Sequence, residues 1–332
     1  MNEIENTDHE EKFESRLDLE GLQKSVAAVK EEVAKVIVGQ HSMVDLMIAA
    51  ILCNGHVLIE GVPGIAKTLT AKLIAKTIDA EFKRIQFTPD LMPSDVLGTS
   101  IFNPGTGFFE FKSGPIFANL VLIDEINRAP AKTQSALFEV MEERHITIDG
   151  NTYSMAYPFM IFATQNPIDH EGTYSLPEAE LDRFIFKIDI TYPNLEEEIK
   201  ILELKHTNKD HLDISNIKKI FDPEELMAYK DLTHKVVVEQ KLLEYIAKIV
   251  TVTRTHSSLF MGASPRASIA LLNSSKAFAA MNGRDFVIPD DIKYMSGHVL
   301  RHRIIETPEK EMEGISRDEI IKEIIEEVEV PR

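Results

Sequence analysis

The stretch HVLIEGVPGIAKT, residues 56–68, decides the fold of this chain. An apolar run leads into a turn rich in Gly and Pro, and a helical pattern of apolar residues then runs from Leu69 to Ile78. A strand, a glycine-containing loop and a helix in this order form the cradle that a nucleoside triphosphate requires. The stretch therefore predicts a phosphate-binding loop at the end of a strand.

Within this loop, Gly61 and Gly64 allow backbone N–H groups to point at phosphate oxygens, and the following helix adds the partial positive charge of its N-terminus. Lys67 is expected to reach the β- and γ-phosphates, and the Thr68 hydroxyl is expected to bind Mg²⁺. Ala66 stands where the usual G-x-x-x-x-G-K-[ST] pattern has its second Gly. An ordinary Gly/Pro turn before a helix is the alternative, and only the context of the loop argues against it.

That context is a second apolar run, NLVLIDE at residues 119–125, which ends in two carboxylates. Apolar residues without alternation suit a strand that is buried on both faces of a parallel sheet. The carboxyl ends of such strands border the ligand crevice, so Asp124 can hold Mg²⁺ and Glu125 can polarise a water for attack on the γ-phosphate. An acidic pair after an apolar run is common by itself, and the loop upstream gives this one its meaning.

A third apolar run, FMIFATQN at residues 159–166, ends in amide side chains. Asn166 could hydrogen-bond the γ-phosphate or the attacking water. Taken alone, a turn Asn before Pro167 is the better interpretation of this residue.

Taken together, these motifs resemble the MoxR family of AAA+ ATPases. The family itself carries Ala at the Ala66 position, and the similarity extends from about residue 20 to residue 304. The matching stretches are GVPGIAKT (residues 61–68), GPIFANLVLIDEINRAPAKTQSALFEVMEE (114–143), ATQNP (163–167), LPEAELDRF (176–184) and SPRA (264–267).

The resemblance implies an α/β fold, an AAA+ P-loop NTPase with a parallel five-stranded sheet sandwiched by helices and followed by an all-α lid domain. The organisation expected from it is a nucleotide-binding domain at 17–192 and a helical lid at 193–305, within which Pro223, Pro265 and Pro289 indicate helix starts. The charge of the two ends indicates an acidic disordered N-terminus at residues 1–16, and the helical spacing of apolar residues from Ile320 to Val328 indicates an acidic C-terminal helix at 306–332. Two β insertions are expected in the nucleotide-binding domain, at about 95–114 and 144–155. Asp149-Gly150 in the second insertion is a strong hairpin signal.

The resemblance also implies roles for individual residues. Arg183 matches the family's finger arginine, which is offered to the ATP of an adjacent subunit, and Arg266 has a sensing role toward ATP in the same or a neighbouring subunit. Without the resemblance, a surface salt bridge is the better interpretation of each, and Arg128 has no assigned role. The remaining ATP-binding residues implied are Val38, Gly39 and Gln40 beside the adenine, and Gly61, Val62, Pro63, Gly64, Ile65, Ala66, Lys67, Thr68 and Leu69 around the phosphates.

Composition limits the possible partners. The 332 residues carry a formal net charge of −18, and a surface of this sign repels phosphate backbones, so no nucleic acid is expected as a partner. No run approaches 18 apolar residues, so no membrane span is expected, and the N-terminal sequence lacks the pattern of a signal peptide. The single cysteine, Cys53, is compatible with a reducing compartment, and a cytoplasmic location is expected.

The expected function is Mg²⁺-dependent hydrolysis of ATP by a homo-oligomeric ring, a hexamer by resemblance, coupled to chaperone-like remodelling, maturation or activation of a client protein or metalloenzyme. A von Willebrand factor A domain protein is the partner that the resemblance implies. The alternatives are the motor subunit of a metal chelatase and a nucleotide switch that barely hydrolyses. A GTPase is disfavoured because no N-K-x-D motif with the required spacing is present.

Overall fold

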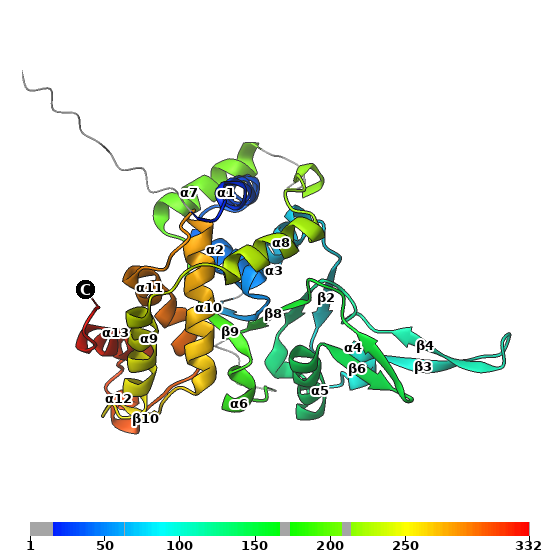
Figure 1. Cartoon of the computed structure of the whole chain (residues 1–332). Helices are drawn as coiled ribbons and strands as arrows, with labels where there is room; N and C mark the ends of the chain where they lie inside the picture. The colour runs from blue at the N-terminus through cyan, green and yellow to red at the C-terminus, as the bar shows by residue number, and fades with distance from the viewer. Residues whose placement is uncertain (1–15, 63, 167–172, 208–213, 332) are drawn as a thin grey trace, which may run out of the picture.

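A parallel five-stranded sheet in the order β2-β5-β8-β1-β9 lies at the centre of the first part of the chain (Figure 1). The computed structural model describes residues 16–62, 64–166, 173–207 and 214–331, so Pro63 and nearly all of the predicted disordered N-terminus lie outside the described residues. The strands are β1 (His56–Gly61), β2 (Phe82–Gln86), β5 (Leu120–Asp124), β8 (Met160–Gln165) and β9 (Phe184–Ile190).

Both faces of this sheet are covered, as the apolar runs predict. In β5, Leu120 and Leu122 belong to one buried cluster while Val121 and Ile123 belong to another on the opposite face. The first cluster includes residues of α1 (Glu20–Ala34), α2 (His41–Cys53) and α3 (Lys67–Thr77). The second includes residues of α4 (Pro93–Leu97) and α5 (Ala131–Glu143). The predicted sheet sandwiched by helices is confirmed.

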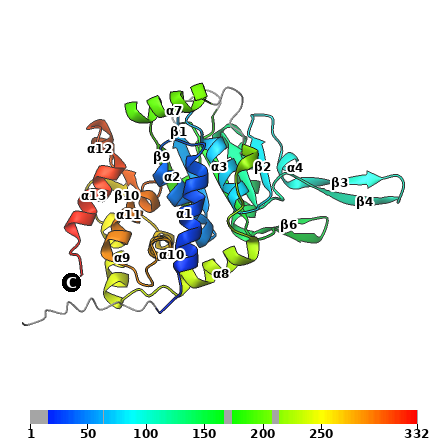
Figure 2. The ribbon, with the colours of Figure 1, turned by 90° about the horizontal axis from the view of Figure 1, so that it is seen from above.

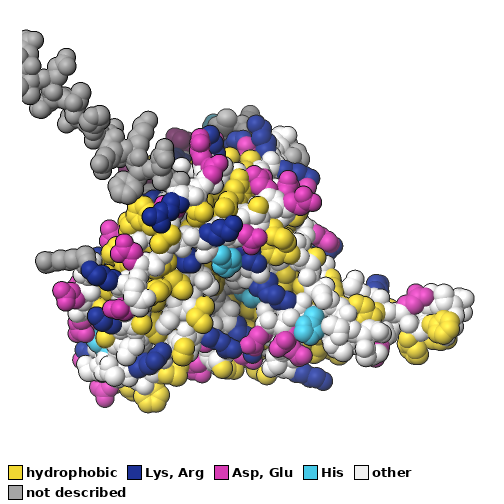
Figure 3. Space-filling model, in the orientation of Figure 1, with side chains coloured by type: hydrophobic (Ala, Val, Ile, Leu, Met, Phe, Trp, Pro, Cys, Tyr) yellow, Lys and Arg dark blue, Asp and Glu magenta, His cyan; other side chains and the backbone are white. Residues whose placement is uncertain are grey.

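Two antiparallel hairpins extend from this core at the predicted insertions. The longer one, β3 (Gly98–Asn103) with β4 (Phe108–Ser113), projects from the molecule as an arm (Figure 2). Phe108 and Phe109 near its tip are 74% and 72% exposed, and apolar side chains are visible at the end of the arm in Figure 3. The shorter hairpin joins β6 (His145–Ile148) to β7 (Asn151–Ser154) through Asp149-Gly150, and both turn residues have positive φ as a type I′ turn requires.

The second part of the chain is helical, apart from a two-stranded ladder between β10 (Leu259–Met261) and β11 (Ile305–Glu306). Its helices are α7 (Leu195–Thr207), α8 (Pro223–His234), α9 (Gln240–Thr253), α10 (Pro265–Met281) and α11 (Pro289–Leu300). Three of them begin with the prolines that the sequence indicates as helix starts, because Pro at the first helical position loses no intrahelical hydrogen bond.

The acidic C-terminal segment contains two helices, α12 (Pro308–Met312) and α13 (Arg317–Glu327), so the prediction of a single helix over 306–332 is wrong. Gly314 has a φ of 75° and ends the first helix, and Ser316 starts the second by a reciprocal capping box with Glu319. The apolar face of α13 packs into the same buried cluster as the lid. None of the described helices is both long and apolar enough to cross a membrane.

We predict that Ile324→Ala will lower the free energy of unfolding by about 2–5 kcal/mol, because it removes a fully buried side chain from the contact between α13 and the lid. Denaturant unfolding measures this change. The matched control is Ile269→Ala on α10, where the side chain is 59% exposed and a much smaller loss is expected. Equal losses at the two positions would show that α13 does not contribute to the folded core.

Candidate active site

The carboxyl ends of the five strands meet at one edge of the sheet. In the register, Gly61 of β1 pairs with Ile190 of β9, Glu60 pairs with Gln165 of β8, and Asp124 of β5 pairs with Gln86 of β2. The loop that follows Gly61 and the segments that follow Asp124 and Gln165 therefore all begin at this edge. In this way the sheet brings together the motifs of the phosphate loop, the two carboxylates and Asn166.

The phosphate loop has the backbone conformation that its glycines suggest. Gly64 has a φ of 88°, and no atom lies within 4 Å of the position that a Cβ would take there. At Gly61 a Cβ would lie 2.9 Å from the Ile190 carbonyl oxygen, so only glycine fits this closely packed start of the loop. Ala66 has a φ of 62°, a left-handed conformation that costs a non-glycine residue roughly 1–2 kcal/mol. Strain of this kind often accompanies functional sites.

Lys67 folds back over the loop that precedes it. Its ammonium donates a hydrogen bond of 2.5 Å to the Gly61 carbonyl oxygen. Partial burial lowers the pKa of Lys67 from its usual value, while the nearby charges of Asp124, Glu125 and Glu60 act in the opposite direction. The ammonium thus lies at the start of the loop, bound to a carbonyl oxygen that phosphate oxygens would replace.

Asp124 is buried, and both of its carboxylate oxygens are held. Thr164 donates to Oδ1 at 3.1 Å, and Arg84 on β2 donates to Oδ2 at 2.6 Å. Thr68, the second residue of α3, supplies a hydroxyl beside Lys67. Hydroxyl and carboxylate oxygens are the hard ligands that Mg²⁺ prefers, so the predicted pair of Thr68 and Asp124 fits this ion.

Glu125 is held in a distinct orientation directly after β5. Its φ of 59° turns the backbone away from the strand, and its N–H donates to the Thr164 hydroxyl at 3.0 Å. One carboxylate oxygen of Glu125 accepts a hydrogen bond of 2.8 Å from Gln86 and lies 3.1 Å from Nε of Arg128. Arg128, which had no assigned role, therefore forms a salt bridge with the candidate general base.

Sequence reasoning did not identify Thr164, Arg84 or Gln86 as parts of the site. Thr164 lies within the ATQNP stretch, but its two contacts across to β5 follow only from the strand register. Arg84 and Gln86 alternate on β2 and reach the two carboxylates from the neighbouring strand. Their spacing of two residues is the one signal in the sequence that could have placed them on the same face.

The candidate adenine segment borders a cavity of about 560 Å³ between the α1–α2 connection and α7. Val38 and Gly39 line it, together with Glu197 and Lys200 from α7. Gly39 has a φ of 71° and passes so close to Glu197 that a Cβ would lie 2.5 Å from its Oε1. The volume lies within the range of small-molecule pockets, and Gln40 begins α2 beside it as a left-handed N-cap.

Arg183 and Arg266 lie at the other end of the sheet, where its parallel strands begin. Arg183 directly precedes β9, whose first residue pairs with His56 at the start of β1, whereas the phosphate loop follows the end of β1. The seven residues of β9 span roughly 20 Å at the usual rise of a strand. Since the strands are parallel, this length separates Arg183 from the phosphate loop of its own chain.

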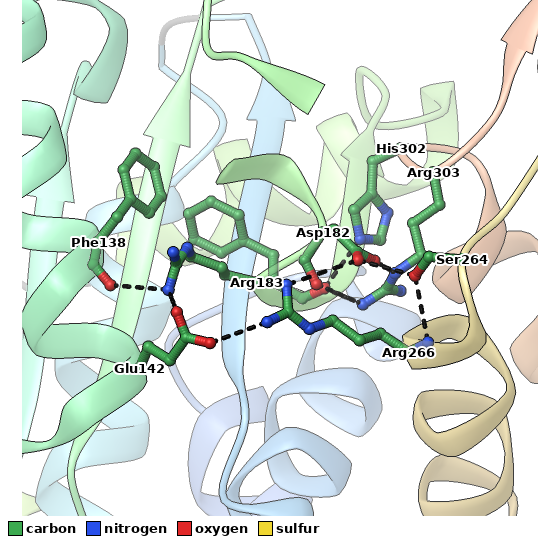
Figure 4. Close-up of polar contacts among 9 residues, drawn as sticks. Phe138, Glu142, Asp182, Arg183, Ser264, Arg266, His302 and Arg303 are labelled. Atoms are coloured by element: carbon green, nitrogen blue, oxygen red, sulfur yellow. Dashed lines mark hydrogen bonds and ion pairs between the residues drawn. The ribbon is translucent and has the colours of Figure 1, made fainter. Parts of the chain in front are cut away.

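A single carboxylate holds the two arginines together (Figure 4). Glu142, in the last turn of α5, accepts a hydrogen bond of 2.8 Å from Arg266 and forms an ion pair with Arg183. Burial, and then the charge of Arg266, lowers the pKa of Arg183 from its usual value. Arg303 and Asp182 lie beside them, so that ion pairs join three guanidinium groups and two carboxylates in one network.

Comparisons with known proteins agree with this fold. Residues 56–186 match the model of the ATPase family associated with various cellular activities (AAA), and residues 251–324 match that of the AAA lid domain. The chain is 46% identical to the uncharacterized protein YeaC of Bacillus subtilis over 94% of this chain and 97% of that protein. It is 42% identical to the chaperone MoxR1 of Mycobacterium tuberculosis over 94% of this chain and 85% of that protein.

Among solved structures, the chain resembles a crystal structure of a protein from Cytophaga hutchinsonii that is assigned as an ATPase. The TM-score is 0.87 and the sequence identity is 42%, over 95% of this chain and 97% of the other.

We predict that Lys67→Ala will abolish ATP binding, because the loop loses the ammonium that lies against its first carbonyl. Isothermal titration calorimetry with Mg²⁺ and ATP measures this loss. Lys72→Ala is the matched control, since Lys72 is exposed on the same helix and its removal leaves the loop intact. Unchanged affinity in Lys67→Ala would rule out the loop as the phosphate site.

Proposed function

Because the chain belongs to the MoxR family of AAA+ ATPases, we propose that it hydrolyses ATP with Mg²⁺ and uses the reaction to remodel a partner protein. The observation that carries this proposal is the meeting of Lys67, Asp124 and Glu125 at the carboxyl edge of one parallel sheet. A phosphate cradle, a metal-binding carboxylate and a second carboxylate are the minimal set for phosphoryl transfer to water.

In this proposal each residue has one task. Lys67 exchanges the Gly61 carbonyl for phosphate oxygens, and Thr68 and Asp124 hold the metal ion. When bound, Mg²⁺ neutralises charge on the phosphate oxygens. Glu125 orients a water and takes its proton, and Asn166 at the end of β8 hydrogen-bonds the γ-phosphate or that water.

The location of the arginines supports catalysis between subunits. Arg183 lies about one strand length from the phosphate loop of its own chain, so a second copy must bring such an arginine to the γ-phosphate. Arg266 shares Glu142 with Arg183, which favours a neighbouring subunit over the same subunit for its action as well. A closed ring, a hexamer by family resemblance, offers every site such a neighbour.

We propose that loss of the γ-phosphate on hydrolysis moves the lid and the surfaces attached to it. The printed name of the Mycobacterium tuberculosis relative, a chaperone, supports remodelling or activation of a client protein. We further propose a von Willebrand factor A domain protein as a partner and a cytoplasmic location. The single cysteine is compatible with that compartment.

We predict that Glu125→Gln will bind ATP with nearly unchanged affinity but hydrolyse it at least about 100-fold more slowly, because the amide cannot accept the proton of water. Calorimetry and phosphate release measure the two quantities. Glu139→Gln, an exposed position on α5, is the control and should keep full turnover. Full turnover in Glu125→Gln would instead assign the general base to another residue and refute this role.

We predict that Arg183→Ala will bind ATP yet lose about 10³- to 10⁵-fold in turnover, because the transferring phosphoryl group loses its arginine from the neighbour. Adding this variant to wild-type protein should reduce turnover more than in proportion, since each variant subunit also disables an adjacent site. Arg317→Ala near the C-terminus serves as the control. A purely proportional decrease would contradict catalysis between subunits.

A further inference from the structure

The guanidinium group of Arg303 is saturated with hydrogen bonds. Its side chain is 3% exposed, and all five of its N–H donors have acceptors. Nε donates to Asp182 Oδ1 at 2.7 Å, and the terminal nitrogens donate to four backbone carbonyl oxygens, those of Asp182, Phe184, Ile185 and Val299. Three of these carbonyls belong to the segment that contains Arg183 and opens β9, while Val299 belongs to the lid helix α11.

Asp182 connects this group to a second element of the lid (Figure 4). Its Oδ2 accepts a hydrogen bond of 2.8 Å from the Ser264 hydroxyl, while its Oδ1 accepts from Arg303. The Ser264 oxygen also caps α10 by accepting from the N–H of Arg266 at 3.1 Å. Asp182 therefore contacts Ser264, the residue before α10, and Arg303, which lies just after α11. It also directly precedes Arg183 in the chain.

We propose that Asp182 and Arg303 are positioning residues that hold Arg183 and Arg266 in one fixed arrangement for the neighbouring active site. This inference rests on the proposed function, in which these arginines act on the ATP of another subunit. Neither Asp182 nor Arg303 touches the reacting atoms. They act by fixing the backbone on both sides of Arg183 and the first turn of α10.

The physical basis is the rigidity of a buried ion pair whose hydrogen bonds are all satisfied. Removal of one partner leaves a desolvated charge, so the pair resists local rearrangement. The base of the lid consequently cannot move relative to the start of β9 without carrying both arginines with it. Since a displacement of about 1 Å can cost roughly 100-fold in rate, this fixed arrangement affects turnover rather than ATP affinity.

A purely structural role is the competing explanation, and mixed assemblies distinguish the two. The donor subunit carries Glu125→Gln, which offers Arg183 but cannot hydrolyse its own ATP. The receiver subunit carries Arg183→Ala, which keeps its own site but offers no finger. Neither turns over ATP alone, so turnover of the mixture reports a donor arginine acting at a receiver site.

Asp182→Asn is then introduced into one partner at a time. In the donor it should reduce the turnover of the mixture by about 10- to 100-fold. In the receiver it should have no effect, because the receiver's own finger is already absent. Calorimetry should give an unchanged ATP affinity in both cases. Equal losses in donor and receiver, or no loss in the donor, would overturn the proposal.

Two further variants keep the test decisive. Asp291→Asn disturbs another buried ion pair of the lid, that with Arg284 at 2.6 Å, and should leave the donor fully active. Arg303→Lys retains the charge with fewer donors and provides a milder donor variant if Asp182→Asn does not fold. If the unmodified donor and receiver produce no turnover together, catalysis between subunits itself fails and the positioning role fails with it. Turnover that is insensitive to both Asp182→Asn and Arg303→Lys in the donor would refute the positioning role alone.

Discussion

The parallel register of the central sheet is the constraint on which every other part of the site depends. It aligns the ends of β1, β5 and β8, so that the segments that carry Lys67, the two carboxylates and Asn166, far apart in sequence, meet at one side of the sheet. The same register places Arg183 at the start of β9, at the amino ends of the strands. One sheet thus separates the candidate nucleotide site from Arg183, which we propose acts on the ATP of another copy.

The cluster of charged residues around Arg183 and Arg266 is held together by ion pairs as much as by packing. Arg183 and Arg266 repel each other, and Glu142 compensates by binding both. Asp182 compensates Arg303 in the same way, inside the protein where solvent cannot.

Much of this architecture follows from local sequence patterns, because strands, turns and helix starts depend on neighbouring residues. The apolar run of β5, the Asp149-Gly150 turn and the proline helix starts all lie where their patterns place them. The break at Gly314 was missed because the regular spacing of apolar residues in α13 dominated a longer acidic stretch. Of the candidate site, the sequence indicated the residues that would touch ATP.

The residues that hold those groups in place were not indicated by any local pattern. Thr164 lies on the strand beside the Asp124 carboxylate that it contacts, and Arg303 is separated by more than one hundred residues from Asp182. Such pairs are determined by tertiary packing, and a single sequence carries no periodic signal for them. The same limit applies to Arg266, whose distance from its own phosphate loop depends on how the lid docks against α5.

The outer strand β2 has a consequence for the behaviour of many copies at high concentration. Among the described residues no strand pairs with its outer side, and such an edge can in general template the addition of strands from other molecules. Here it presents Lys83, Arg84 and Gln86 as exposed side chains around a single buried Ile85. Charge of this kind on a short edge discourages fibrous aggregation. A ring of the kind we propose would thus form through other surfaces, without the sheets of its subunits pairing edge to edge.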